Sequence, residues 1–333
     1  MELSTDQNDL ASCCRLCGGK FGDRLLVREM MFGTRETFAY RQCLQCDCLQ
    51  IETIPDDIAR HYGGGYYSYD LRRHKRLKRW RRGLRRRWII VAPEPVIAFM
   101  SLFSSPDPLF RIYRSIGLKL GDRVLDVGTG SGGHVLELKD AGVAGAVGLD
   151  PFVDKDVMLD GEILVHQKSL AEMTGMFDLI TSHHSLEHMP DQMNALSQAR
   201  RLLAPNGRVL IRVPTVSSDA FEHYSENWVN LDAPRHFFLH SHRSLGDVAS
   251  RAGLMIDRLW CDSSDMQFMA SEQYAKDIPL MDPRSTAVAK RDGIFSRAQR
   301  QAFARKAEMV NSALRGDTIC VTMSNNSRGA ENG

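Results

Sequence analysis

The hydrophobic pattern between residues 121 and 261 alternates short apolar runs with longer amphipathic segments. The short runs have the length of buried strands, and the segments that follow them have helical periodicity. We predict seven strands, in the segments DRVLDVGTG, GAVGLD, ILVHQ, FDLITS, RVLIRVP, LMIDRLWC and, near the C-terminus, DTICVTM. We predict three helices, in GGHVLELKDAG, MNALSQARRLLAPNG and SLGDVASRAG, the first stopped by Gly142 and the second by Pro205-Asn206-Gly207. This alternation implies a doubly wound, mainly parallel α/β sheet.

The remaining segments suggest three further regions. Residues 10–60 contain most of the cysteines and predict a small N-terminal lobe. Residues 61–120 contain YGGGYYSY, a basic run and a Pro-interrupted apolar stretch, and predict a basic helical connector. The large domain then extends over residues 121–325 and includes a helical insertion at 262–315.

The composition is that of an ordinary globular protein, with 43% hydrophobic and 25% charged residues among 333. The start, MELSTDQNDL, is polar and acidic, unlike a signal peptide. No run of about 18 apolar residues occurs, so we expect no transmembrane helix and a cytoplasmic location.

Positive charge is concentrated in residues 71–88, LRRHKRLKRWRRGLRRRW, which hold eleven Lys/Arg and no acid. Leu77, Trp80, Leu84 and Trp88 recur there at helical spacing. The favoured interpretation is a solvent-exposed basic helix that packs on the rest of the protein, in which acidic residues outnumber basic ones. The second is peripheral contact with an anionic membrane at the inner face of the cell membrane. Nucleic acid comes last, because no RNA-binding signature accompanies the charge.

Six of the eight cysteines lie between residues 13 and 48. Cys14-x-x-Cys17 and Cys43-x-x-Cys46 have the spacing of a tetrahedral zinc site. Gly18 follows the first pair and Asp47 the second, and Asp tolerates the left-handed backbone that such turns require. Buried thiols without a metal are the alternative, and Cys13 and Cys48 are substitute ligands.

A glycine turn follows the first predicted strand, in VLDVGTGSGG. Glycines at this position let a ligand approach the backbone at a helix N-terminus. Asp150 ends the next strand, where a carboxylate can accept the hydrogen bonds of a ribose diol. The glycines also satisfy the dinucleotide pattern, but Asp126 inside the motif suits a cationic ligand better than a pyrophosphate.

Together with FDLITS, LEHMPD and ARRLLAPNGRVLIRVP, this motif resembles the class I S-adenosylmethionine-dependent methyltransferases. The resemblance covers residues 121–261 and the last strand. It implies a Rossmann-like, seven-stranded sheet whose last strand is antiparallel. It also implies a site for S-adenosylmethionine that consists of Asp126, Gly128, Thr129, Gly130, Asp150, Ser169, Leu170 and His183.

The cysteine module in front of such a domain resembles a bacterial methyltransferase family associated with polysaccharide and deoxysugar biosynthesis. The segments NWVNLDAPRHFFLHSHRSL and SEQYAKDIPL carry this resemblance. It implies a structural zinc ion and a small hydroxylated acceptor, a sugar or a glycan precursor.

A histidine cluster follows the fourth predicted strand, in TSHHSLEHMP. If HSLEHM begins a helix, His184, Glu187 and His188 share one face. One interpretation is that Glu187 and His188 only cap and brace this turn. The other is that the cluster supplies a general base for a hydroxyl acceptor. His183 or His184 suits the base role, as does His236 or His240 from APRHFFLHS.

A metal-assisted mechanism is the alternative. Ubiquinone-pathway and small-RNA O-methyltransferases carry Glu-x-x-Glu-His at this position, and a downstream histidine completes their metal site. The similar set here is His184, Glu187, His188 and His236, which favours a softer ion than Mg²⁺ or no metal at all. The resemblance implies a lipid, quinone or RNA terminus as the acceptor in this alternative. A non-catalytic scaffold with this fold is the third hypothesis.

Overall fold

The computed structural model describes residues 13–62, 76–102, 106–290 and 293–325. The chain forms two compact units, each built from discontinuous segments. Unit 1 comprises Met1–Gly63, Leu186–Met193 and Arg212–Val321, and unit 2 comprises Gly64–Ser185, Asn194–Ile211 and Thr322–Gly333. Most of YGGGYYSY and the first five residues of the basic run, 71–75, lie outside the described residues.

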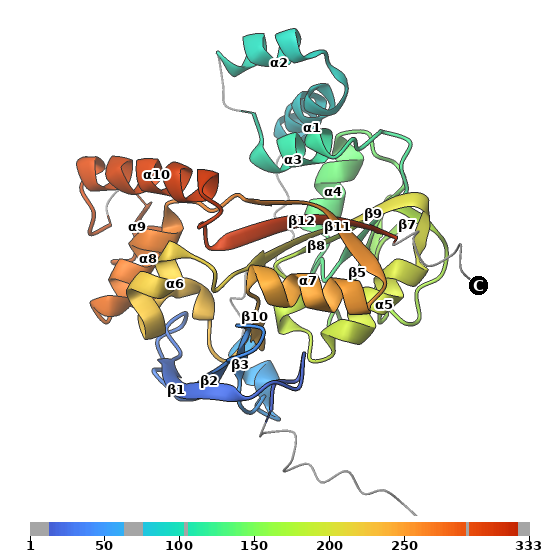
Figure 1. Ribbon diagram of the computed structural model, residues 1–333. Coiled ribbons are helices and arrows are strands. Elements are labelled where there is room, and N and C mark those ends of the chain that lie inside the picture. Colours follow the sequence, from blue (N-terminus) through green and yellow to red (C-terminus); the bar gives the residue numbers. More distant parts are fainter. Residues whose placement is uncertain (1–12, 63–75, 103–105, 291–292, 326–333) are drawn as a thin grey trace, which may run out of the picture. The chain divides into compact units, whose positions relative to one another are not determined.

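Parallel strands form the centre of unit 2 (Figure 1). They are β4 (Val124–Val127), β5 (Ala146–Leu149), β7 (Glu162–His166) and β8 (Phe177–His183). β4 pairs in parallel with both β5 and β8, and β5 pairs in parallel with β7. All four residues of β4 are buried, as expected for a strand covered on both faces of its sheet.

The whole sheet has the strand order β11-β12-β9-β8-β4-β5-β7-β6. β9 (Leu203–Pro214), β11 (Leu254–Cys261) and β12 (Thr318–Asn325) are the other predicted strands, and the last strand in sequence lies between β9 and β11. The doubly wound α/β prediction is confirmed, but the number of strands was wrong. β6 (Val157–Leu159) is an additional strand at the edge of the sheet. It pairs antiparallel with β7, because Asp160 and Gly161 both adopt positive φ in a tight hairpin turn.

The helix after the glycine turn follows the sequence pattern, whereas the next predicted helix is shorter than expected. α4 (Gly133–Asp140) ends just before Gly142, whose φ is 99°. α5 (Gln192–Arg201) ends before Pro205-Asn206-Gly207, which belongs to β9 instead. The backbone oxygen of Leu202 already accepts a hydrogen bond from the Phe177 N–H, and this contact takes the chain out of the helix early.

Three helices precede β4 in unit 2: α1 (Arg76–Val91), α2 (Glu94–Ser101) and α3 (Pro108–Ser115). α1 contacts α3 and α4 (Figure 1). Pro93 separates α1 from α2, because proline cannot continue a helix. Within the described ranges, none of the helices has the length and apolar character needed to cross a membrane.

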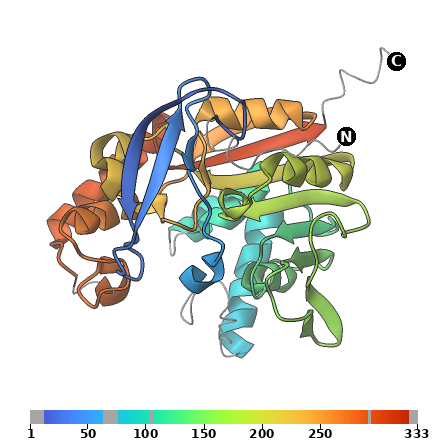
Figure 2. The same cartoon turned by 90° about the horizontal axis from the view of Figure 1, so that it is seen from below.

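Unit 1 contains an antiparallel sheet in the order β1-β2-β3-β10. Its strands are β1 (Phe21–Arg28), β2 (Thr37–Cys43), β3 (Leu49–Ile51) and β10 (Phe238–Leu239). Figure 2 shows β1 and β2 side by side. The N-terminal lobe therefore completes its sheet with a strand from almost 190 residues later in the chain.

Unit 1 also contains β11, the end of β9, the start of β12 and several helices. The α-helices are α6 (Asp219–Tyr224), α7 (His242–Arg251), α8 (Met266–Ala275), α9 (Thr286–Ala289) and α10 (Arg297–Ser312). Short 3-10 helices occupy Ile58–Tyr62, Leu186–His188, Ser225–Asn227 and Val229–Leu231.

Candidate functional site

The glycine turn at the carboxyl end of β4 has the backbone of a ligand-binding loop. Gly128, Gly130 and Gly132 have φ values of 72°, 59° and 85°, which disfavour side chains. A Cβ atom at Gly128 would also lie 2.4 Å from the Cβ of Ser185. The loop therefore needs glycine at this position for both its conformation and its clearance.

Asp150, directly after β5, holds this loop in place. Its carboxylate accepts hydrogen bonds from the Gly130 N–H at 2.8 Å and from the Phe152 N–H at 2.9 Å. Asp150 is buried, and burial raises its pKa against the effect of the two N–H donors. Each carboxylate oxygen has a second lone pair, so the group can also accept bonds from a ribose diol.

The other predicted cofactor residues differ in their burial and in the hydrogen bonds that they already make. The Thr129 hydroxyl oxygen is buried and has no hydrogen-bond partner among the described residues, so a bound ligand could supply one. The N–H and hydroxyl of Ser169 both donate to Glu172, so they brace a turn. Leu170 is half-buried, and its backbone oxygen accepts a weak bond from Arg201.

Asp126 and His183 belong to a polar cluster of unit 2 that also contains His134. One ligand atom from each of the three lies within 4.8 Å of the others. Asp126 is buried and accepts a hydrogen bond from Thr181 at 2.7 Å. This cluster places a carboxylate and two imidazoles next to the glycine turn, where a cationic ligand is favoured.

Tyr113 of α3 connects the two histidines of this cluster. Its hydroxyl lies 2.8 Å from Nε2 of His183 and also hydrogen-bonds to Nε2 of His134. Nδ1 of His134 lies 3.8 Å from Glu137, so we place the His134 proton on Nδ1. Tyr113 then donates to His134 and accepts from Nε2 of His183, which makes Nδ1 of His183 the basic nitrogen.

The expected helix at HSLEHM is not formed. His184 is exposed and has a left-handed backbone with φ 50°, and the helical turn begins only at Leu186. His184 therefore does not share a helix face with Glu187 and His188. The prediction was wrong because a left-handed residue cannot belong to a right-handed helix.

Three of the four predicted metal ligands converge in unit 1. Ligand atoms of Glu187, His188 and His236 lie within 4.8 Å of one another, and His184 is not part of this group. The Glu187 side chain is fully buried, and its carboxylate lies 3.9 Å from Nε2 of His236.

The protonation of both imidazoles is set by backbone carbonyls. Nδ1 of His188 lies 2.8 Å from the Arg235 oxygen, and Nδ1 of His236 lies 2.7 Å from the Asn230 oxygen. A carbonyl only accepts, so each Nδ1 carries a proton, and each Nε2 is the ring nitrogen that can face an ion. Burial, and next the neighbouring His236, lower the pKa of His188 to about 4, so this ring is neutral at physiological pH.

A buried ion network borders this cluster. Arg235 is fully buried and contacts Glu29 at 3.0 Å and Asp232 at 2.6 Å. Burial alone would raise the pKa of Asp232, but the charge of Arg235 lowers it, so both carboxylates are ionised. Asp232 also lies 3.7 Å from Nε2 of His236.

His240, the remaining candidate base, is a structural residue of the interior. Its Nδ1 contacts Ser244 at 3.0 Å, and its Nε2 contacts Gln192. Burial lowers its pKa to about 4. With both ring nitrogens occupied by side chains, His240 braces the start of α7.

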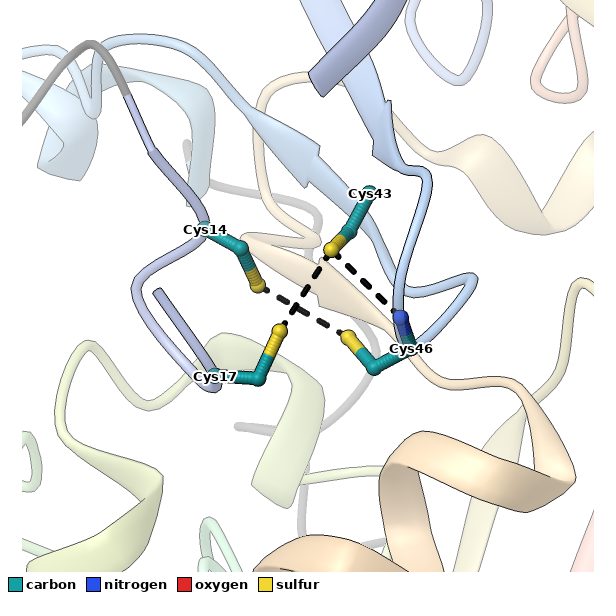
Figure 3. A group of neighbouring side chains, drawn as sticks. All are labelled: Cys14, Cys17, Cys43 and Cys46. Carbon is teal, nitrogen blue, oxygen red and sulfur yellow. Dashed lines mark hydrogen bonds between the residues drawn. The ribbon is translucent and has the colours of Figure 1, made fainter. Parts of the chain in front are cut away.

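The four cysteine side chains point toward one another from two turns of the N-terminal lobe (Figure 3). The sulfurs of Cys14 and Cys46 are 3.7 Å apart, and those of Cys17 and Cys43 are 3.4 Å apart. Tetrahedral zinc with Zn–S bonds of about 2.3 Å requires sulfur separations of about 3.8 Å. The donor set and its dimensions therefore fit zinc.

The surroundings of the sulfurs also suit thiolates. Backbone N–H groups of Gly19 and Gln45 donate to Cys17 and Cys43, and the Gln50 amide donates to Cys14. The hydrogen bond between Cys14 and Cys46 lowers the pKa of Cys14 to about 5 and raises that of Cys46, so without an ion only one thiolate of this pair is favoured. Cys13 and Cys48 lie outside the group of four.

The backbone predicted for the two cysteine turns is confirmed. Gly18 and Asp47 follow their turns with φ values of 73° and 60°. The two turns are thus equivalent in conformation although their residues differ.

Sequence reasoning missed the residues that support these clusters. Tyr113 comes from an amphipathic helix whose pattern shows only a buried face. His134 directly follows the glycine turn in GGHV, so its position was a usable signal. Glu29, Asp232 and Arg235 are brought together by tertiary structure, and no spacing motif marks them.

Comparison with known proteins identifies the class. The family model described as "Methyltransferase domain" matches residues 73–259, more than half of the chain, so this chain belongs to that family. The prediction of a class I methyltransferase domain is confirmed.

Individual relatives match shorter segments. A segment of 101 residues is 30% identical to the ubiquinone biosynthesis O-methyltransferase of Pseudomonas aeruginosa (strain LESB58) and covers 27% of this chain and 44% of that protein. Another, of 114 residues, is 27% identical to the 27-O-demethylrifamycin SV methyltransferase of Amycolatopsis mediterranei (strain S699) and covers 30% and 42%. The matches thus span less than half of these curated relatives.

Solved structures with a related fold include an S-adenosylmethionine dependent methyltransferase from Mesorhizobium loti. It shares 15% identity and a TM-score of 0.41, over 64% of this chain and 96% of that one. The cyclopropane synthase MmaA2 from Mycobacterium tuberculosis shares 15% identity and a TM-score of 0.39, over 66% and 85%. The narrower resemblance to a polysaccharide-associated family stays a prediction.

Proposed function

We propose that this protein transfers the methyl group of S-adenosylmethionine to a small hydroxylated acceptor. The observation that carries the proposal is the glycine turn at the end of β4, tied to the carboxylate of Asp150 at the end of β5. Membership of the methyltransferase-domain family supports the same activity.

The reaction needs few protein groups, because the sulfonium charge of S-adenosylmethionine already activates the methyl carbon. The acceptor oxygen forms a bond to that carbon, the carbon–sulfur bond breaks, and its electron pair stays on sulfur. The hydroxyl proton must leave to a base during this step. We assign this role to Nδ1 of His183, with Tyr113 and His134 holding the tautomer that keeps this nitrogen basic.

The acceptor class is the least constrained part of the proposal. A sugar or glycan precursor is our expectation from the sequence. The names of two relatives refer to O-methylation of a quinone precursor and of a rifamycin, and that of a third to N-methylation of phosphoethanolamine. A hydroxyl acceptor agrees with the first two and with a histidine base.

Calorimetry of S-adenosylmethionine binding tests the cofactor site. Asp150→Ala should weaken binding roughly ten- to a hundredfold, because a charged hydrogen-bond acceptor is lost. Asp154→Ala, an exposed acid four residues later, is the control and should bind normally. A wild-type protein that binds no S-adenosylmethionine would overturn the proposal.

Screening of metabolite fractions for the gain of one CH2 then tests turnover. His183→Asn should reduce kcat about 10²–10⁴-fold and weaken cofactor binding much less than this. His184→Asn is the matched control. Tyr113→Phe should change the pH profile of kcat, which a purely structural role would not do. Cofactor binding without turnover on any fraction would favour the scaffold hypothesis instead.

A second candidate, metal-assisted methyl transfer, is supported by the geometry of Glu187, His188 and His236. Two imidazole nitrogens and a buried carboxylate form a two-histidine, one-carboxylate set, and the backbone carbonyls at Nδ1 fix the ring orientations. Such a set suits Mn²⁺, Fe²⁺ or Zn²⁺ better than Mg²⁺. A bound ion would hold and acidify the acceptor hydroxyl.

Elemental analysis separates the two candidates. If the ion is present, Glu187→Gln and His236→Ala should each remove the same metal, and activity lost in chelator should return with one divalent ion. His223→Ala, an exposed histidine of the same unit, is the control. Activity that persists in chelator would exclude this mechanism and leave the His183 base.

We also propose that Cys14, Cys17, Cys43 and Cys46 hold a structural zinc ion. The lobe they organise is small, and its sheet is completed only by β10. Metal binding would then contribute folding free energy that this lobe cannot obtain from its own core.

A further inference from the structure

The apolar stripe of α1 faces outward. Trp80, Leu84 and Trp88 are spaced four residues apart and therefore lie on one side of the helix. Trp80 is 61% exposed and Trp88 50% exposed, and Leu84 is exposed as well. A helix of a globular protein normally turns such a stripe toward the core. In α1 the stripe faces the solvent instead.

The inward side of α1 buries Ile89 and Ile90 near the end of the helix and is otherwise held by arginines. Arg79 pairs with Asp140 at 2.7 Å, and Arg86 pairs with Asp107 at 2.9 Å and with Glu137 at 2.7 Å. Gly83 lets the helix approach α4 so closely that a Cβ there would lie 2.4 Å from the Asp140 carbonyl oxygen. These contacts fix the orientation that exposes the tryptophans.

Exposed cations lie along α1, and two of them, Arg81 and Arg87, flank the stripe. Lys78, Arg81, Arg82 and Arg87 are exposed, and none of them pairs with a carboxylate in the part of the chain that the structure describes. At 100° per residue, Arg87 and Arg81 lie on either side of the Trp80–Leu84–Trp88 stripe. The outer side of α1 thus combines aromatic and aliphatic groups with uncompensated positive charge.

α2 continues this surface character. Val96, Phe99 and Leu102 are exposed on it or directly after it, and Phe99 is 62% exposed. Val91, at the end of α1, is exposed as well. Figure 1 shows α2 beyond α1, on the side away from α4. Two successive helices therefore place large apolar side chains in solvent, which is costly unless a partner covers them.

We propose that α1 and α2 form a docking surface for an anionic lipid bilayer. Tryptophans and aliphatic side chains suit the boundary between headgroups and acyl chains, and the flanking cations suit anionic headgroups. A second copy of the chain fits less well, because two identical basic faces repel each other. Nucleic acid also fits less well, because exposed Leu84, Val96 and Leu102 cannot stack on bases as aromatic groups do.

The proposal does not depend on methyl transfer, so vesicle binding tests it directly. Full-length protein should co-sediment with phosphatidylcholine vesicles that contain phosphatidylglycerol and not with pure phosphatidylcholine, and salt should weaken the binding. Arg81→Glu combined with Arg87→Glu, and Trp80→Ser combined with Trp88→Ser, should each weaken binding on the order of tenfold or more. Met309→Ser, an equally exposed apolar residue of α10, is the control.

Fluorescence provides a readout of geometry. Spin-labelled lipids should quench the emission of wild type, and most of the quenching should be lost in the Trp80/Trp88 double variant, because Trp228 is fully buried and Trp260 is half-buried on β11. All substituted residues are exposed, so thermal unfolding should be unchanged. Equal binding to neutral vesicles, or no binding to either, would overturn the proposal. So would self-association or single-stranded RNA binding that the same variants abolish while vesicle binding stays intact.

Discussion

The cysteine cluster and the Glu187–His188–His236 cluster are both ligand-rich groups of unit 1, but they are assembled in different ways. The cysteines come from two short turns, each of which places its own pair of sulfurs. The second cluster joins a 3-10 turn at residues 186–188 to a residue almost 50 positions later. One cluster is thus set mainly by local backbone geometry and the other by long-range packing.

The difference shows when a spacing motif can be trusted. The C-x-x-C pattern predicted all four converging sulfurs, because two ligands in one turn have few ways to be arranged. The His-x-x-Glu-His pattern also had helical spacing, but the backbone at His184 is left-handed and the helix does not form. A spacing argument depends on the secondary structure that it assumes.

The two clusters also differ in what orders them. In the cysteine cluster, thiols face one another, and a metal ion would replace weak sulfur contacts by strong bonds. The histidine cluster already has its rings held by carbonyls and its border held by the buried Arg235 network. We therefore expect the first to depend on its ion for stability and the second to keep its shape without one.

The largest effect should come from removing a sulfur. Cys43→Ser should lose about one zinc per chain and destabilise the lobe by on the order of 5 kcal/mol, because metal binding there is coupled to folding. Cys13→Ser, outside the cluster, should retain metal and stability. Elemental analysis and urea unfolding measure both effects. Absence of zinc from freshly purified wild-type protein would contradict the proposed zinc site and the stability difference expected between the two clusters.

The next largest effect should come from the ion network. Arg235→Met leaves Glu29 and Asp232 buried without their cation and should cost about 3–5 kcal/mol. Arg284→Met removes an exposed pair with Asp282 and should change stability far less than Arg235→Met does. Similar losses in the two variants, measured by urea unfolding, would show that the network does not order the histidine cluster.

The pH dependence should be smaller. His240 has a pKa of about 4 when folded and an ordinary value of 6.5. Between these values the unfolded chain binds more protons, so stability falls as pH decreases through this window. His240 should account for a loss of about 2 kcal/mol between pH 7 and pH 5. Urea unfolding of His240→Gln should show a correspondingly shallower pH dependence, and an identical one would contradict this account.

The smallest effect compares the two cysteine turns. Gly18→Ala should cost about 1 kcal/mol, because its left-handed backbone disfavours a side chain although space is open around it. Asp47→Gly should change stability by less than about 0.5 kcal/mol, since relief of backbone strain and the greater freedom of the unfolded chain offset each other. Both are measured with zinc present. A large gain from Asp47→Gly would mean that the second turn is strained.

The sequence determined the elements whose cause is local. Apolar runs, glycine turns and cysteine spacing predicted the doubly wound sheet, the glycine turn after β4 and the convergence of four sulfurs. These features depend on backbone conformation and burial within a few residues. The Asp160-Gly161 pair in the sequence is also a signal for a hairpin turn. The hairpin was not predicted, because β6 is only three residues long.

Tertiary structure alone decided the contacts between distant segments. It placed Tyr113 between two histidines, closed the N-terminal sheet with β10, buried Arg235 against Glu29, and turned the tryptophans of α1 outward. Helical periodicity identifies a stripe on α1, but not which side faces the core. The side that faces the core is determined by the arginine contacts with α3 and α4 and by the close approach at Gly83. Such contacts between distant segments produce no periodic pattern in a single sequence.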